Sequence, residues 1–133
     1  MSLFIDTSAL LAVLNADDLY HQQARLQWVS SISEDEVLVS TNYVLIETNA
    51  ILQNRIGMEA VRLLWDDIVP VLTVHWVDET LHNASLSALV TASRRKLSLV
   101  DCVSFECMRR LGIKKAFTFD PHFKDQGFTN IPV

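Results

Sequence analysis

Four acidic residues have the side chains and surroundings best suited to chemistry. Clustered carboxylates bind hard divalent cations, and such ions promote the hydrolysis of phosphodiesters. Asp6 follows the apolar run LFI, Asp120 follows the apolar run AFTF, and Asp101 comes three residues after Ser98. An aspartate before a helix caps it, and S-x-x-D is a capping-box pattern. Considered singly, each of these three aspartates is better explained as a helix cap.

Glu47 differs because it lies inside a predicted helix, in the stretch TNYVLIETNAIL. Its neighbours three and four residues away are Tyr43, Val44, Ala50 and Ile51, which form an apolar stripe. A carboxylate on a buried helix face costs several kcal/mol unless a cation or good hydrogen bonds compensate it. The pattern therefore predicts an inward Glu47 that needs a partner from elsewhere. The alternative is a glutamate at the edge of the stripe that reaches solvent.

The elements that must position these acids alternate between strands and helices. Short apolar runs predict strands at 3–5, 37–40, 71–74 and 116–119. Helical periodicity and capping residues predict helices at 8–15, 19–32, 42–55, 58–68, 79–95 and 99–112. This alternation favours parallel strands joined by right-handed helical crossovers. We therefore expect one α/β domain over residues 1–133, with a central parallel sheet flanked by α-helices.

Ligands of such sheets bind beyond the carboxyl ends of the strands, where Asp6 and Asp120 are expected. With Asp101 at a helix start and Glu47 facing inward, all four acids can meet in one crevice. Their repulsion raises some of their pKa values unless divalent cations lie between them, so we expect Mg²⁺ or Mn²⁺. The four histidines have no spacing typical of a zinc site, and His122 is expected to cap a helix or lie on the surface.

Composition indicates a globular protein with a substantial core. Of the 133 residues, 50% are apolar, and only 3 Gly and 3 Pro interrupt them. No apolar run approaches the roughly 20 residues that cross a bilayer, and no secretory signal is recognisable, so we expect a cytoplasmic protein with no membrane partner. Cys102 and Cys107 are expected to be small buried apolar side chains.

The charge is unevenly distributed. The net charge of −5 argues against a uniformly basic nucleic-acid-binding surface, yet residues 94–124 hold eight of the 11 basic side chains and only three acids. Either these bases are solvated helix ends and loops, or they guide an RNA backbone. The RNA-backbone candidates are Arg94, Arg95, Lys96, Arg109, Arg110, Lys114, Lys115 and Lys124.

The segments FIDTSAL, VLIETNAIL, LSLVDCVSFECMRRLGI and KKAFTFDPHF, in this order, resemble the PIN-domain ribonucleases. The likeness is greatest to the VapC-type toxins of type II toxin–antitoxin systems, and it runs from Asp6 to Phe123. The resemblance implies a Mg²⁺- or Mn²⁺-dependent endoribonuclease. Its catalytic and metal-binding residues would be Asp6, Glu47, Asp101 and Asp120.

The resemblance also implies supporting residues and partners. The hydroxyls of Thr7, Ser8 and Thr118 match polar positions that orient a carboxylate or a water. A homodimer and a small antitoxin protein that inhibits the site are expected. The segment between Ile56 and Asp78 has no motif that can be aligned, so the sequence leaves the RNA target open.

Two other classes fit part of the pattern. A Mg²⁺-dependent phosphoacceptor or phosphatase module also uses acids at the edge of a parallel sheet. It needs one isolated reactive aspartate, often with a lysine, and Glu47 would crowd such a site. A catalytically silent PIN-like adaptor could bind RNA or protein without cleavage, but it would be free to lose at least one of the acids.

Overall fold

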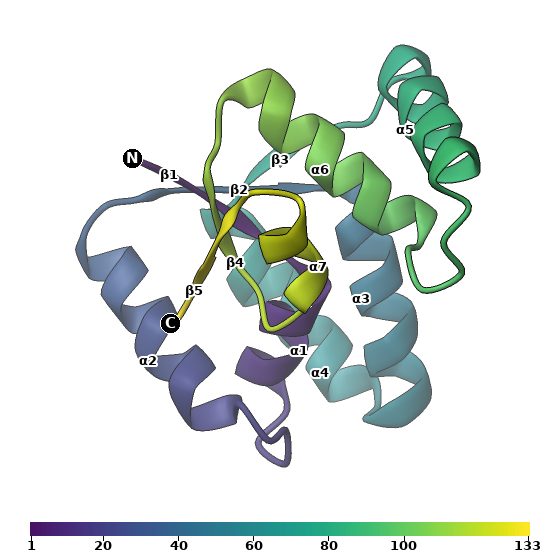
Figure 1. The fold of residues 1–133 in the computed structure, drawn as a ribbon. Helices are drawn as coiled ribbons and strands as arrows, with labels where there is room; N and C mark the ends of the chain where they lie inside the picture. Colours follow the sequence, from purple (N-terminus) through teal and green to yellow (C-terminus); the bar gives the residue numbers. More distant parts are fainter.

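The computed structural model describes residues 1–133 and has a five-stranded sheet at its centre (Figure 1). All neighbouring strands pair in parallel, so the predicted α/β class with a central parallel sheet is confirmed. The strands run in the order β3-β2-β1-β4-β5. Their bounds are β1 (Ser2–Ile5), β2 (Val37–Thr41), β3 (Thr73–His75), β4 (Lys115–Phe117) and β5 (Thr129–Ile131).

Helices flank this sheet (Figure 1). Among them, α1 packs against α2 and α3, and α6 packs against α5 and α3. No helix is long and apolar enough to cross a membrane. Their bounds are α1 (Thr7–Leu14), α2 (His21–Ser33), α3 (Asn42–Arg55), α4 (Met58–Leu63), α5 (Glu79–Ala92), α6 (Leu99–Leu111) and α7 (Pro121–Asp125), with a π-helical turn η1 (Leu64–Ile68) and a 3-10 turn η2 (Val69–Val71).

The strand order reverses between β1 and β4. From β1 the chain proceeds to β2 and β3 on one side, then crosses back to β4 and β5 on the other. Leu3, Phe4 and Ile5 of the central strand are fully buried, as expected for a strand covered on both faces. A reversal of this kind leaves a crevice at the carboxyl ends of the two central strands.

Most predicted elements are present, but the segment after α3 differs. The sequence predicted one helix over 58–68, whereas the α-helix ends at Leu63 and continues as η1 and η2. Pro70 explains this, because its ring would clash with the carbonyl of Asp66 in a continued α-helix. The next strand is displaced accordingly and begins at Thr73 instead of residue 71.

Other elements also differ from the prediction. The helix expected to reach Arg95 ends at Ala92, because Ser93 adopts a left-handed conformation with φ of 52°. The strand expected over 116–119 ends at Phe117. β5 was missed, since three residues before a proline carry almost no strand signal. The expectation for the cysteines is confirmed, because both are unpaired and buried.

Candidate active site

The structure brings the four predicted acids together at the carboxyl edge of the sheet. Asp6 directly follows β1, and Asp120 follows its neighbour β4, on either side of the reversal in strand order. Asp101 lies in the first turn of α6, and Glu47 lies in α3, which packs against α6. The charge of Asp101 acts on both Asp6 and Glu47, and that of Asp120 acts on Glu47 and Asp101.

Asp6 is the most deeply buried of the four, with 4% of its surface exposed. Its Oδ2 accepts hydrogen bonds from Thr118 Oγ1 at 2.8 Å, Ser8 Oγ at 2.9 Å and the Ser8 backbone N–H at 3.4 Å. The Ser8 hydroxyl also accepts the Phe119 N–H at 2.9 Å. These contacts hold the carboxylate by Oδ2, and Oδ1 receives no well-directed hydrogen bond, although the Thr7 backbone N–H lies close enough to lower the pKa of the group.

Asp120 is the N-cap of α7, and Asp101 is the N3 residue of the capping box that Ser98 begins, as the sequence predicted for each. Oδ2 of Asp101 accepts the Ser98 N–H at 3.2 Å in a complete capping box, and Oδ1 of Asp120 accepts the His122 N–H at 2.9 Å. Each aspartate again leaves its second oxygen without a well-directed hydrogen bond. The cap therefore orients the carboxylate while one oxygen stays available as a ligand atom, so the two explanations are compatible.

Glu47 occupies the edge of the buried face of α3. That face consists of Val44, Leu45, Thr48 and Leu52. The predicted stripe was therefore wrong in phase: Ala50 is exposed, and Glu47 is half-buried. Glu47 lies close enough to the other acids for the charges of Asp101 and Asp120 to raise its pKa further, while the Thr7 hydroxyl lowers it.

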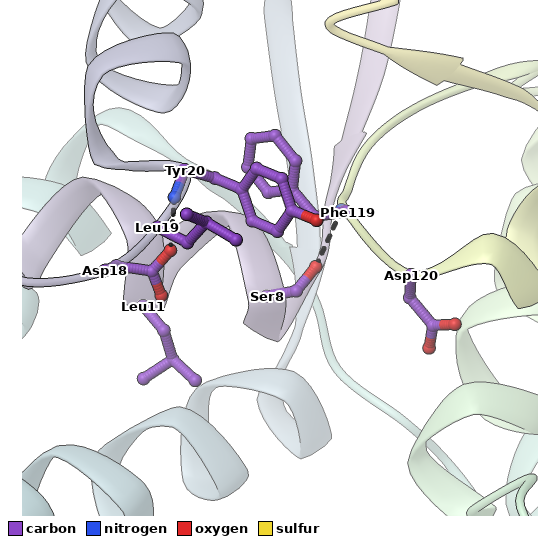
Figure 2. A pocket seen from close by; sticks show the side chains of 7 residues that line it. All are labelled: Ser8, Leu11, Asp18, Leu19, Tyr20, Phe119 and Asp120. Carbon is purple, nitrogen blue, oxygen red and sulfur yellow. Dashed lines mark hydrogen bonds between the residues drawn. The ribbon is translucent and has the colours of Figure 1, made fainter.

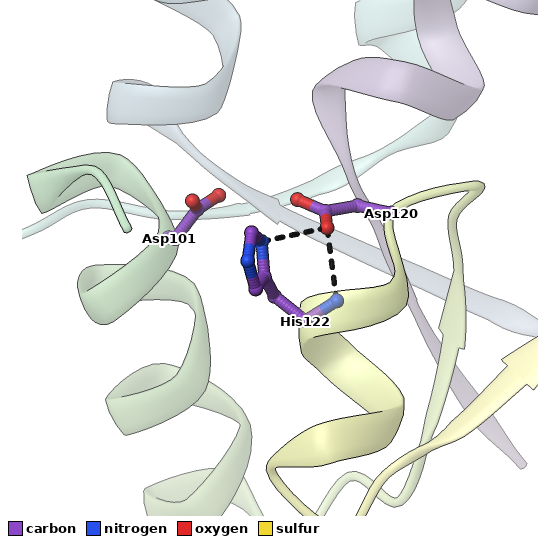
Figure 3. A group of neighbouring side chains, drawn as sticks. All are labelled: Asp101, Asp120 and His122. Atoms are coloured by element: carbon purple, nitrogen blue, oxygen red, sulfur yellow. Dashed lines mark hydrogen bonds and ion pairs between the residues drawn. The ribbon is translucent and has the colours of Figure 1, made fainter. Parts of the chain in front are cut away.

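His122 is a site residue that the sequence analysis assigned to a surface or cap role. Its Nδ1 lies 2.9 Å from Oδ1 of Asp120 and is buried without a well-directed hydrogen bond. One ligand atom from each of Asp101, Asp120 and His122 lies within 4.8 Å of the others (Figure 3). The available signal was the cap itself, because the residue two positions after an N-cap lies in the first helical turn beside it.

Burial is the main cause of the raised pKa values in this cluster. It raises the pKa of Asp6 from an ordinary 3.8 to about 6, although Thr118 and Ser8 donate to the carboxylate and partly oppose the rise. Burial also raises the pKa of Glu47 and of Asp101, and in both cases repulsion by the neighbouring acids adds to it. The Thr7 hydroxyl acts in the opposite direction on Glu47.

The donor set fits a hard divalent cation. No Lys or Arg forms an ion pair with any of the four acids, so nothing in the protein neutralises their charge except His122 when it is protonated. Three aspartates each present an oxygen without a well-directed hydrogen bond, and carboxylate oxygens are the ligands that Mg²⁺ and Mn²⁺ prefer. The missing lysine also distinguishes the site from a phosphoacceptor centre.

The eight basic candidates do not form one surface. The loop that leads into α6 exposes Arg94, Arg95 and Lys96. It adjoins the amino end of α6, and Asp101 lies in the first turn of that helix. Arg109 lies near the other end of α6, where it donates to Gln126 Oε1 at 2.8 Å and lies 5.4 Å from the centre of the Phe128 ring. Its guanidinium therefore has a structural role.

Three of the four remaining basic candidates lie away from the acids. Arg110 lies in the last turn of α6, and Lys114 and Lys115 lie at the start of β4, whereas Asp120 follows the carboxyl end of that strand. These three side chains are thus at the opposite edge of the sheet from the acids. Lys124 is exposed on α7.

The fold and the acid cluster at the strand reversal define a protein class. Residues 3–128 match the PIN domain, and the chain belongs to this family. Curated relatives from two strains of Mycobacterium tuberculosis are each 35% identical over 130 residues, which is 97% of this chain and 97% of the relative, and both are named 23S rRNA-specific endonuclease VapC20.

Solved structures agree with this assignment. The crystal structure of Mycobacterium tuberculosis VapC20, described as a sarcin–ricin loop cleaving toxin, has a TM-score of 0.87 at 34% identity and covers 96% of this chain and 97% of its own. FitAcB from Neisseria gonorrhoeae has a TM-score of 0.69 at 14% identity, over 96% and 95% of the two chains, and shows the fold alone. The predicted resemblance is confirmed, and so is the enzyme class, a PIN-domain ribonuclease of the VapC toxin type.

Proposed function

We propose that this chain cleaves a phosphodiester bond in the sarcin–ricin loop of 23S rRNA. The proposal depends chiefly on one observation: three aspartates at the strand reversal each keep a carboxylate oxygen without a well-directed hydrogen bond. The near full-length likeness to an endonuclease named for 23S rRNA supports this choice of substrate. A folded PIN-like adaptor without catalysis would need no such set of unshared oxygens.

The acids would hold Mg²⁺ or Mn²⁺. Asp6 and Asp101 are proposed to anchor the principal ion, Glu47 to bridge or to orient a water, and Asp120 to complete or support a second position. A divalent ion bound there lowers the pKa of a water and neutralises charge on the phosphoryl oxygens. In the metal-free protein burial raises the pKa values of Glu47 and Asp101, and repulsion among the acids adds to the rise.

Neighbouring side chains orient these carboxylates. The hydroxyls of Ser8 and Thr118 hold Asp6 by Oδ2 and so aim Oδ1 into the crevice. The Thr7 hydroxyl lies near Glu47 and favours its ionised form. His122 lies against Asp120, with Nδ1 2.9 Å from Oδ1, and so restricts the position of that carboxylate. Positions of this kind support ligands without contacting substrate.

The RNA backbone is proposed to approach along the edge that carries the acids. Arg94, Arg95 and Lys96 precede α6, whose first turn contains Asp101, and Lys124 is exposed on α7. These bases can attract phosphates that the acids alone would repel. We retain Arg109, Arg110, Lys114 and Lys115 as weaker candidates, because a large ribosomal substrate extends beyond the cleavage point.

The decisive experiment is cleavage of RNA by the purified chain with Mg²⁺, with Mn²⁺ and with a chelator. Total RNA identifies the cleaved species by the new 5′ ends, and a short sarcin–ricin loop RNA tests the proposed target directly. The Asp6→Asn variant, purified in parallel, controls for contaminating nucleases. Cleavage that persists in the chelator, or equally in Asp6→Asn, would refute the proposed site.

We propose a homodimer and inhibition by a small antitoxin, in the cytoplasm, where 23S rRNA is found. We propose that the domain extends over residues 1–133, because β5, which lies beyond the family match, adds the last strand to the sheet. Light scattering of the purified chain tests the dimer, and copurification with the product of a neighbouring gene tests the antitoxin.

A further inference from the structure

A pocket of about 310 Å³ adjoins the acid cluster (Figure 2). Its walls come from α1, from the loop between α1 and α2, and from the segment between β4 and α7. Ser8 and Asp120 line it, so it is continuous with the proposed catalytic crevice. Pockets of this size accommodate small organic groups, and this one lies where RNA next to a scissile phosphate would pass.

A stacked aromatic pair forms one wall. The rings of Tyr20 and Phe119 are 4.5 Å apart and inclined by 5°, and Phe119 directly precedes Asp120 (Figure 2). Tyr20 is 41% exposed, and the adjacent Leu19 is 87% exposed. Exposed apolar and aromatic surface of this kind, next to a nuclease centre, suits the flat face of a nucleobase, because bases stack on aromatic rings irrespective of their identity.

Besides Ser8 and Asp120, the pocket contains the carboxylate of Asp18. Asp18 Oδ1 accepts the Tyr20 N–H at 2.8 Å, which holds the loop in place, and Oδ2 has no hydrogen-bond partner. An unpaired carboxylate oxygen repels phosphate but accepts hydrogen bonds from the N–H groups of a base edge. The charge therefore argues that a base, and not the sugar–phosphate backbone, occupies this pocket.

We propose that this pocket is a nucleobase subsite that helps to select the cleavage position. The base stacks against Tyr20 and donates its N–H groups to Asp18. Guanine fits best among the four bases, because its Watson–Crick edge presents two adjacent N–H donors to one carboxylate. This inference rests on the proposed ribonuclease function and adds a specificity determinant to it.

The test is cleavage of a short RNA with randomised sequence, read by sequencing the new ends. The wild-type chain is expected to favour guanine at one position close to the cut. Tyr20→Ala is expected to lower kcat/KM by about 5- to 150-fold, the range that loss of one stacked base produces, while Tyr20→Phe keeps the ring and the rate.

Asp18→Asn is the sharper variant. The asparagine oxygen can still accept the Tyr20 N–H, so the loop is preserved, but the free atom becomes a donor. The preference is expected to move from guanine toward bases that present acceptors. If both Asp18→Asn and Tyr20→Ala keep the wild-type base preference and the wild-type rate, the pocket does not bind a nucleobase and the proposed subsite is refuted. Absence of any metal-dependent cleavage by the wild type refutes the proposed function instead.

Discussion

The Thr118 hydroxyl donates a hydrogen bond of 2.8 Å to Oδ2 of Asp6 across 112 positions of the chain. This contact joins the carboxyl ends of β1 and β4, the two strands where the sheet order reverses. It satisfies the oxygen that faces the protein and leaves Oδ1 without a well-directed hydrogen bond. The orientation of this buried carboxylate therefore depends on the topology, through Thr118, as well as on the local helix cap that Ser8 completes.

Asp6→Asn is expected to abolish cleavage while the fold persists. Asparagine keeps an oxygen for Ser8 and Thr118 but removes the buried charge. At pH 7 the metal-free variant should be more stable than the wild type by about 1–3 kcal/mol, given the raised pKa of Asp6. The stabilisation of the wild type by Mg²⁺ should also disappear, since only native-state binding raises the melting temperature. Melting curves with and without Mg²⁺ measure both effects.

The stability of the metal-free protein is expected to fall as the pH rises from about 4 to about 6. The pKa of Asp6 is 3.8 ordinarily and about 6 in the fold, so in this window the native state binds more protons than the unfolded chain. Stability then decreases with pH, and the loss is complete above about 6. Urea unfolding in chelator at pH 4.5 and pH 7 measures it, with Asp6→Asn as the reference. A larger free energy of unfolding at pH 7 than at pH 4.5, attributable to Asp6, would contradict the assignment.

The sequence was sufficient to place the three aspartates but not to describe their contacts. Asp6, Asp101 and Asp120 each follow a strong local signal, an apolar run or a capping residue, and such signals fix where strands end and helices begin. The pairing of Ser8 with Thr118 depends on which strands become neighbours, which is a property of the whole sheet.

The phase of α3 and the role of His122 were harder to predict for a related reason. Which face of α3 is buried depends on its packing against α1 and α6, and so the apolar stripe drawn through Ala50 was displaced. His122 became a neighbour of Asp101 only because α6 crosses close to the start of α7. The pocket at Tyr20 likewise joins two segments about a hundred residues apart.

Glu47→Gln is expected to lose activity without losing stability. The change removes a half-buried charge that burial and the charges of Asp101 and Asp120 disfavour, so the metal-free melting temperature should stay level or rise. The stabilisation by Mg²⁺ should shrink. Glu59→Gln, an exposed glutamate on α4, is the matched control and should change neither activity nor metal response. A large drop in the metal-free melting temperature of Glu47→Gln would mean that its carboxylate has a structural role.

Thr118→Val is expected to reduce activity by about 10- to 100-fold, the range found when a group that orients a metal ligand is removed. Valine keeps the volume but loses the donor to Asp6, so the pKa of Asp6 should rise further and the pH profile of kcat/KM should move upward. Thr118→Ser restores the hydroxyl and should restore the profile. A lower rate with no movement of the pH profile would indicate a packing defect instead.

Replacing Arg94, Arg95 and Lys96 together with alanine is expected to weaken RNA binding and to flatten its salt dependence. Each phosphate contact with single-stranded RNA contributes about 0.7 to the slope of log K against log salt, so three contacts contribute about 2. Lys114→Ala with Lys115→Ala is the control, because these bases lie at the opposite edge of the sheet and should leave the slope on a short RNA nearly unchanged. Binding to the sarcin–ricin loop RNA is measured by fluorescence anisotropy at several salt concentrations. The variant whose slope changes shows which edge of the sheet contacts the RNA. A slope that changes only in the lysine variant would place the RNA at the edge of the sheet opposite the acids.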